Sequence, residues 1–297
     1  MKIFKETNIQ FVKYIKMAIA VSTICILIGI ISMVFFRGLN YGIDFTGGTL
    51  IQVQFDRDIT TAEIRNALAT VKLENSMIQK SVGMNEYIIR VAQDNSMENI
   101  PAQISTGLNT LKETAYEIRR TEQVGPKIGK ELRTATVWAI IWALVVIGIY
   151  ISIRFQFRFA VGAVLALVHD VLFTLGVFSV THLEISLTTI AAFLTIVGYS
   201  LNDTIVVYDR VRENMKIMRS ENMTSIMNHS INETISRTII TSFTTFIVVF
   251  ILAFTTGEIQ IFAIAMMIGV IVGTYSSIYI AGPIVISLQS TRHAEKK

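Results

Sequence analysis

Residues 198–210 read GYSLNDTIVVYDR and place Asp203 inside an apolar run that begins at Leu187. A run of about 20 apolar residues is long enough to cross the hydrocarbon core of a membrane as a helix. A charged side chain within such a helix is costly, so a carboxylate at this position is a functional candidate by default. Asp203 therefore marks both a membrane span and a candidate site.

The composition is that of an integral membrane protein. Hydrophobic residues make up 52% of the 297 positions and charged residues only 16%, a balance too apolar for the surface of a soluble domain. The lone cysteine, Cys25, lies in an apolar stretch, so we expect neither a disulfide framework nor a cysteine metal site. The net charge of +4 bears on membrane orientation rather than on nucleic acid, because the placement of the cations decides topology.

Six stretches are long enough to span a membrane as helices. The first follows a basic leader but runs on to Phe36 without a small-residue cleavage site, so we interpret it as a retained anchor. The predicted fold class is an α-helical membrane protein with six transmembrane helices and one extracytoplasmic α+β domain inserted between the first and the second. The expected spans are residues 17–36, 134–153, 159–180, 187–208, 237–256 and 261–286.

The distribution of cations predicts that both termini are cytoplasmic and that the protein is a multi-pass component of the inner (cytoplasmic) membrane. The two short loops expected outside, THLEIS and TGEIQ, contain no Lys or Arg, only Glu184 and Glu258. The long outer segment carries 12 basic and 12 acidic residues, and such a domain crosses the membrane regardless of charge. The cations placed inside are Lys2, Lys5, Lys13, Lys16, Arg154, Arg158, Arg210, Arg212, Lys216, Arg219, Arg237, Arg292, Lys296 and Lys297.

These features divide the chain into four parts. Residues 1–36 form the cytoplasmic N-terminus and first span, and residues 37–133 form the outer domain. Residues 134–290 form a five-helix membrane domain, and residues 291–297 a cytoplasmic tail. The inside loop at 209–236 is charged and amphipathic, which predicts a helix that continues the fourth span and lies along the membrane; the alternative is a solvated connector.

The outer domain alternates strand and helix signals. The alternation in TLIQVQF predicts a strand, and the TTAE that starts at Thr60 is a capping box for the helix that follows. Further strands and a second amphipathic helix complete a βαββαβ order, which is the ferredoxin-like pattern. The predicted elements are strands at 49–55, 76–82, 86–92 and 116–123, helices after Thr60 and at 97–113, and a turn at Gly83, Met84 and Asn85.

Two carboxylates in the spans are candidate ion-coupling groups. Asp203 lies near the inner end of the fourth span, and Asp170, next to His169, lies near the middle of the third. Arg237 begins the fifth span at a depth similar to that of Asp203. Desolvation favours the neutral form of a carboxyl group and a facing arginine favours the charged form, so this competition permits a switch.

Polar residues at helical spacing accompany both candidates and suggest a hydrated crevice. One stripe follows Arg237 along the fifth span, and the other includes Asn202 beside Asp203. The alternative is a structural ion pair between Asp203 and Arg237, and for His169 a packing role is equally open. The stripes consist of Thr241, Thr244 and Thr245 on the fifth span, and Thr188, Thr195, Tyr199 and Asn202 on the fourth.

Enzyme motifs were sought without success, so we expect a protein that is not an enzyme and needs no cofactor. The stretch GPKIGKEL (125–132) has three residues rather than four between its glycines, and Glu131 stands where a phosphate-binding loop needs Ser or Thr. Four scattered histidines do not form a metal site. Any energy used must come from an ion gradient or a partner.

Several motifs together resemble the SecF family, the smaller membrane subunits of the bacterial SecD–SecF translocation accessory, within the resistance-nodulation-division superfamily. The likeness covers nearly the whole chain. One departure is Tyr208, where the family motif NDTIVVFDR usually has Phe; the aromatic ring is kept. The matching stretches are the opening segment, GIDFTGGT (42–49), VGPKIGKEL (124–132), ALVHD (166–170) and SRTIITSFTT (236–245).

The resemblance implies assembly with SecD and use of the proton gradient to help move unfolded preproteins through the SecYEG channel after SecA has pushed them. By resemblance, Asp203 is the family's membrane aspartate and Arg237 its partner arginine, and membrane lipid surrounds the unit. Together with the residues singled out by the polar pattern, the predicted coupling set is Asp203, Arg237, Asp170, Asn202, Thr241 and Thr245. The signature segment with Gly42, Asp44, Gly47 and Gly48 is expected to act as a hinge to the outer domain.

Two rival functions remain open at this point: a small-molecule exporter of the same superfamily, and a scaffold of the translocon without ion coupling. A domain of under 100 residues and six spans offer no second half to build a substrate channel, which weighs against the exporter. A lone aspartate among hydroxyl groups could bind either H⁺ or Na⁺, and we favour H⁺.

Overall fold

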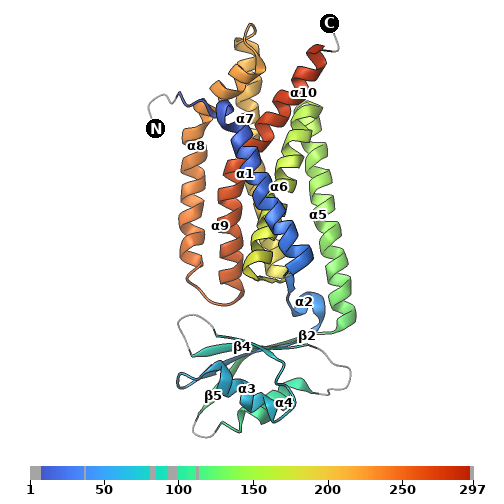
Figure 1. Ribbon diagram of the computed structural model, residues 1–297, viewed down its shortest axis with the longest axis vertical. Coiled ribbons are helices and arrows are strands. Elements are labelled where there is room, and N and C mark those ends of the chain that lie inside the picture. The colour runs from blue at the N-terminus through green and yellow to red at the C-terminus, as the bar shows by residue number, and fades with distance from the viewer. Residues whose placement is uncertain (1–7, 37, 81–84, 93–98, 112–113, 295–297) are drawn as a thin grey trace.

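The chain forms a bundle of long helices with a small α+β domain at one end (Figure 1). This computed structural model describes residues 8–36, 38–80, 85–92, 99–111 and 114–294, and the side chains only as far as residue 288. The predicted turn residues Gly83 and Met84 and the terminal cations Lys2, Lys5, Lys296 and Lys297 lie outside the described residues. Arg292 lies in the last helix.

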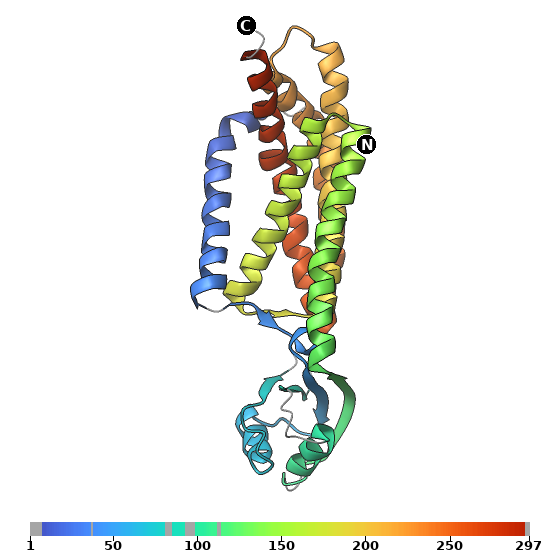
Figure 2. The same ribbon diagram turned by 90° about the vertical axis from the view of Figure 1, so that its right-hand side faces the viewer.

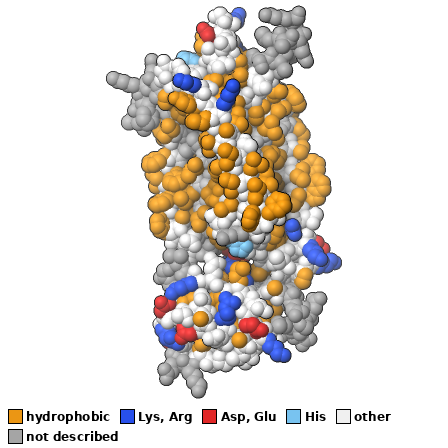
Figure 3. Space-filling view, in the orientation of Figure 1, with side chains coloured by type: hydrophobic (Ala, Val, Ile, Leu, Met, Phe, Trp, Pro, Cys, Tyr) orange, Lys and Arg blue, Asp and Glu red, His pale blue; other side chains and the backbone are white. Residues whose placement is uncertain are grey.

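The described residues contain six helices that are long and apolar enough to cross a membrane, which confirms the predicted fold class. Figure 3 shows hydrophobic side chains covering the bundle between two charged ends. The first span, Phe11–Phe36, contains α1 (Ile15–Ile31), and the last contains α9 (Glu258–Ser276), a π-helical turn (Ser277–Ala281) and α10 (Gly282–Ala294). The others are α5 (Pro126–Arg154), α6 (Phe157–Thr181), α7 (Leu187–Ile217) and α8 (Met223–Leu252).

The segment expected as an inside loop at 209–236 is instead the ends of two helices. α7 does continue past the fourth span, as predicted, but it ends at Ile217, and α8 begins at Met223. Arg210 holds Glu233 with two hydrogen bonds of 2.6 Å, and Asn214 donates to Glu233 at 2.7 Å. These bonds join the two extensions to each other, so neither lies alone along the membrane.

The outer domain has the predicted βαββαβ order. Its helix α3 (Thr61–Ala69) begins with the predicted capping box, in which Thr60 and Glu63 satisfy each other's backbone N–H groups. α4 begins after its N-cap Asn99 and ends at Leu108, before the described residues 109–111 that the prediction included; positions 97–98 and 112–113 of that prediction lie outside the described residues. The elements are β2 (Gly48–Phe55), α3, β3 (Met77–Lys80), β4 (Glu86–Val91), α4 (Ile100–Leu108) and β5 (Tyr116–Val124).

The outer sheet is antiparallel in the order β3-β4-β2-β5. Each helix therefore connects two strands with a third strand between them, as the ferredoxin-like pattern requires. Alternate residues of β2, such as Ile51 and Val53, pack on α3 and α4, whereas Leu50 belongs to the face turned toward the bundle. The sheet thus lies between its own helices and the membrane domain (Figure 1).

The domain and the bundle are joined by continuous elements rather than by flexible linkers. α5 starts at Pro126 directly after β5 and runs along the whole bundle (Figure 2). A second junction is a parallel pair of short strands, β1 (Asn40–Tyr41) with β6 (Glu184–Ile185), which precede α2 (Ile43–Thr46) and α7.

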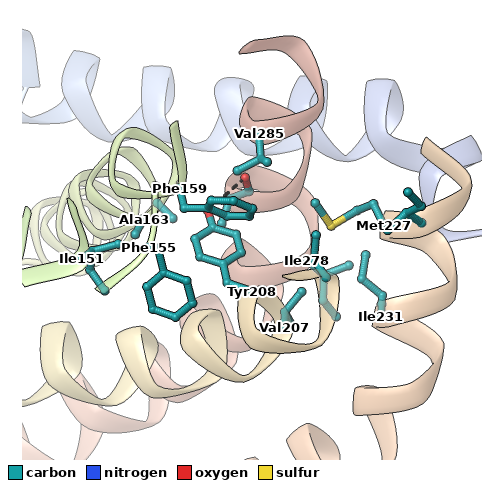
Figure 4. Packing of buried hydrophobic residues seen from close by; sticks show 14 of the residues in the cluster. Ile151, Phe155, Phe159, Ala163, Val207, Tyr208, Met227, Ile231, Ile278 and Val285 are labelled. Atoms are coloured by element: carbon teal, nitrogen blue, oxygen red, sulfur yellow. Dashed lines mark hydrogen bonds between the residues drawn. The ribbon is translucent and has the colours of Figure 1, made fainter. Parts of the chain in front are cut away.

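The bundle packs most tightly where small residues meet. At the other end of the bundle from the outer domain, Phe155, Phe159 and Tyr208 form a buried aromatic group (Figure 4). Nearer the outer end, Gly29 of α1 faces Gly176 of α6 so closely that an added Cβ on Gly29 would lie 2.5 Å from the Gly176 Cα. Such close approach of helix backbones is the use that membrane helices make of glycine.

We expect Gly29→Ala to lower the thermal unfolding midpoint of the purified chain, because backbone atoms of α6 would have to move. Gly198→Ala is the matched control: Gly198 also lies in a span, but its added Cβ would meet nothing within 4 Å. That change should leave the midpoint equal or higher, since alanine favours helix by about 1 kcal/mol over glycine. Equal behaviour of the two variants would contradict the close packing of α1 on α6.

Candidate functional site

Asp203 lies on α7 with its side chain buried among hydroxyl groups of two neighbouring helices. The residue is only 3% exposed. Ser242 of α8 donates to the Asp203 Oδ2 at 3.4 Å, and the Ser242 Oγ lies 2.6 Å from the Thr274 Oγ1 of α9. A chain of hydroxyls therefore leads from α9 to the carboxyl group.

Arg237 lies on the helix next to Asp203 but does not pair with it. The Arg237 side chain is exposed, and the described residues contain no ion pair between the two. The charge of Arg237 still acts on Asp203 through space. The alternative of a structural ion pair is thus not realised in this structure.

Within the described residues, Thr241, Thr245 and Asn202 form no hydrogen bond with the Asp203 carboxyl group. Thr241 is half-buried and donates to the backbone carbonyls of Arg237 and Thr238. Thr245 is half-buried as well. Asn202 is exposed, because it precedes Asp203 by one position and therefore points about 100° away from it around the helix. The sequence argument missed Ser242, which bonds to Asp203, and Thr274, which bonds to Ser242.

Asp170 lies at the centre of a second and closed network. It is fully buried, and its Oδ2 accepts from Ser200 of α7 at 2.6 Å and from Ser276 of α9 at 2.8 Å. Its Oδ1 lies 2.9 Å from the His169 Nδ1, and the Nε2 of the same ring bonds to Ser22 of α1. The network joins α1, α6, α7 and α9.

His169 therefore has a polar role in addition to its packing. Its ring also lies against Tyr275, whose hydroxyl donates to the Ala18 carbonyl at 2.6 Å. Adjacent helix residues point about 100° apart, yet the short side chain of Asp170 still reaches the ring. Asp170 has every carboxylate oxygen satisfied, whereas Asp203 has one long hydrogen bond.

The signature glycines form a closely packed junction at the outer end of the bundle. Gly47 and Gly48 have φ of +75° and +141°, which only glycine adopts readily. An added Cβ would lie 2.9 Å from the Pro126 Cα at Gly47 and 2.5 Å from the Val91 carbonyl oxygen at Gly48. This packing explains why these two positions need glycine, and the hinge role of the segment stays a prediction.

Asp44 of the same segment holds the start of α7. Its Oδ2 accepts a hydrogen bond from the Leu187 backbone N–H at 2.8 Å, which satisfies a free donor of the first helical turn. Gly42 donates to the Ile185 carbonyl at 2.9 Å. The signature segment is thus bonded to the helix that carries Asp203.

Two ion pairs dock the outer sheet on the bundle, and both use the lone acids of the outer loops. Arg90 of β4 pairs with Glu184, with side chains only 11% and 9% exposed, and Arg120 of β5 lies 3.3 Å from Glu258. Glu258 also accepts from Thr188 of α7. Burial raises the pKa of the Glu184 carboxyl above its usual range, against the opposing effect of the Arg90 guanidinium, and the nearby Asp44 and Glu258 raise it further.

Comparison with known protein families shows which family this sequence resembles. Residues 103–291 match the family described as "Protein export membrane protein SecD/SecF, C-terminal", and residues 33–59 match the "SecD/SecF GG Motif". The chain is 46% identical over 295 residues to "Protein translocase subunit SecF" of Magnetococcus marinus, which covers 96% of this chain and 94% of the relative.

The chain belongs to the SecF family. A SecF of Rhodothermus marinus is 44% identical, covering all of this chain and 98% of that protein, and one of Vibrio alginolyticus is 43% identical, covering 95% and 90%. The GG motif is the segment that contains Gly47 and Gly48. The C-terminal family match includes both Asp170 and Asp203.

Solved structures give the same fold for this SecF family member. The crystal structure of SecDF from Thermus thermophilus, titled a translocon-associated membrane protein, matches with a TM-score of 0.86 at 34% identity over 96% of this chain. SecDF in a "Super-membrane-facing form" matches with a TM-score of 0.70 at 33% identity over the whole chain. The chain spans 39% and 40% of those two longer chains.

The two carboxylates should differ in what their removal costs. Asp170→Ala leaves three side-chain partners without their acceptor, and a hydrogen bond between membrane helices contributes about 0.6 kcal/mol on average. We expect a loss of about 2 kcal/mol and a clearly lower unfolding midpoint in detergent. Asp203→Ala, the matched change on α7, should lower the midpoint far less; equal losses would contradict the distinction between the two sites.

The outer junction should respond to pH through Glu184. Because burial raises its pKa in the folded chain, the folded state binds this proton more tightly than the unfolded state does. The wild type should therefore gain stability relative to Glu184→Gln as the pH falls, in the range just above the usual glutamate value of about 4.3. Thermal unfolding of both proteins across that range measures the difference, and parallel curves would rule out the effect.

Proposed function

We propose that this SecF family member is the subunit of a protein translocase that works with SecD and uses the proton motive force to assist preprotein export through the SecYEG channel. In this scheme SecA first drives the unfolded preprotein into the channel, and the SecD–SecF unit helps it emerge on the outer side. The observation that carries the proposal is the buried but unpaired carboxyl group of Asp203.

The surroundings of Asp203 suit both of its protonation states. A hydroxyl group can donate to a carboxylate or accept from a carboxylic acid, and the side chain that bonds to Asp203 is the hydroxyl of Ser242. An arginine in ion-pair contact would instead hold the group in its charged form. Asp203 can therefore gain and lose a proton without leaving a neighbour unsatisfied.

Helix α7 offers a mechanical path from this group to the outer domain. Asp203 lies 16 residues from Leu187, which corresponds to about 24 Å of helix. At Leu187 the helix is bonded to Asp44, and just before it Glu184 pairs with Arg90 of the outer sheet. A shift of α7 caused by a change in charge at Asp203 is thereby passed to the outer domain, which we propose grips the emerging chain.

SecD is the partner that would complete the site. Arg237 and Asn202 are exposed on the bundle although they lie in apolar spans, and polar groups of this kind are costly in contact with lipid. The solved relatives titled SecDF are more than twice as long as this chain. We propose that SecD covers this polar face and that the coupling ion crosses between the two subunits.

The energy released when protons cross the membrane is sufficient to assist export. One proton that crosses a potential of 100 mV releases about 2.3 kcal/mol. A single protonation cycle of Asp203 could therefore support one shift of α7, with repeated cycles adding up. No nucleotide is needed in this step.

The decisive experiment measures export of a preprotein into membrane vesicles that contain SecYEG, SecA, SecD and this chain, with pH and sodium gradients imposed separately. Asp203→Asn should assemble with SecD and lose the gradient-dependent part of export, whereas the control Cys25→Ala should keep it. Dependence on the pH gradient alone supports H⁺ as the coupling ion.

Other outcomes separate the rival functions. Normal gradient-dependent export by Asp203→Asn would refute the assigned role, and export that is lost only when the protein unfolds would favour a scaffold. Solute efflux by the purified chain without SecD would favour a small-molecule exporter. Labelling of single cysteines introduced at positions 110 and 220 from either side of the vesicles tests the proposed orientation, with position 110 outside.

A further inference from the structure

Three arginines gather at the end of the bundle farthest from the outer domain. Arg154 is the last residue of α5, Arg158 lies in the first turn of α6, and Arg212 lies on α7. We call Arg154, Arg158 and Arg212 the arginine cluster. Its members come from three different helices, so the packing of the bundle brings them together.

Two buried aromatic rings hold the cluster. The guanidinium carbons of Arg154 and Arg212 each lie 5.6 Å from the ring centre of Phe155, and that of Arg158 lies 5.7 Å from the ring centre of Phe159. The two rings are neighbours in the aromatic core, 6.2 Å apart (Figure 4). Cation–π contacts of this kind fix the position of a guanidinium group without neutralising its charge.

The charges of Arg154 and Arg212 are not balanced by an acid in the part of the chain that the structure describes. Within the described residues, neither Arg154 nor Arg212 forms an ion pair, and Arg212 donates instead to the Arg154 backbone carbonyl at 3.2 Å. Arg210, on the same helix, shows the contrast because it pairs with both Glu213 and Glu233. Like charges held close together repel each other, so the cluster favours an anion.

Strongly exposed apolar side chains flank the cluster. Ile153 is 81% exposed and Phe157 is 76% exposed, and each lies one residue from a cluster arginine. Both belong to helices that are long and apolar enough to span the membrane. A ligand at this place meets cations on one side and hydrocarbon on the other, which is the chemistry of a phospholipid at the membrane surface.

We propose that the arginine cluster binds the phosphate of an anionic phospholipid whose acyl chains lie along Ile153 and Phe157. A guanidinium group can offer two parallel N–H donors to phosphate oxygens, and each cation near an anionic membrane surface contributes about 1 kcal/mol to the attraction. The site lies away from Asp203 and does not depend on the proposed function.

The test uses the full chain, purified and freed of lipid in detergent. Its thermal unfolding midpoint is followed as phosphatidylglycerol is added, with phosphatidylcholine and inorganic phosphate as separate arms. Phosphatidylglycerol should raise the midpoint, and Arg154→Gln/Arg212→Gln should need at least about tenfold more of it, as expected for two lost cations. Lys216→Gln/Arg219→Gln removes two cations from the same end of the bundle and should change the requirement less than about twofold.

Each remaining outcome counts against the site. Equal losses in the two double variants would mean general attraction to the charged surface, and equal protection by inorganic phosphate would mean a free anion site. Equal effects of the two lipids would exclude recognition of the headgroup. If the cluster variant does not fold, phosphatidylglycerol with a photoreactive acyl chain is used on the wild type: label on the peptide containing Ile153 and Phe157 supports the site, and label only elsewhere overturns it.

Discussion

The absence of water in the membrane core decides how α7 is built into this bundle. A polar side chain on its buried face is costly unless it finds a hydrogen-bond partner. Ser200 does so through Asp170 of α6, and Asp203 through Ser242 of α8. The small residues of α9 make these contacts possible, because Gly273 brings its backbone close to Ser200 and Gly269 close to Ile196.

The two carboxylates satisfy this constraint in opposite ways, which suggests a division of labour. Asp170 is saturated by hydroxyl groups from two other helices and by the imidazole ring of His169, so its removal or neutralisation disturbs the packing itself. Asp203 has a single long contact and a cation that stays at a distance. A group that is to change its charge repeatedly needs the second kind of environment, since little else has to be rebuilt.

The outer domain is held on the helix bundle by close packing and side-chain contacts rather than by a flexible linker. This affects how motion could pass between the outer domain and the bundle. The signature glycines pack against β5, β4 and the start of α5, while Asp44 caps α7. The contacts that can open without breaking backbone pairing are side-chain ion pairs, Arg90–Glu184 and Arg120–Glu258. Movement of the outer domain against the bundle would therefore require these salt bridges to open.

The sequence alone determined the six spans, the βαββαβ order and the two membrane carboxylates, because hydrophobic period, capping residues and misplaced charges are properties of neighbouring residues. It also showed that Glu184 and Glu258 are the only charges in the short outer loops. Only the tertiary structure decided which residues they meet, that Arg237 stands apart from Asp203, and that Ser242 and Ser276 complete the sites. Those contacts join residues 39 to 138 positions apart, and they depend on how each helix is rotated about its axis, which packing sets.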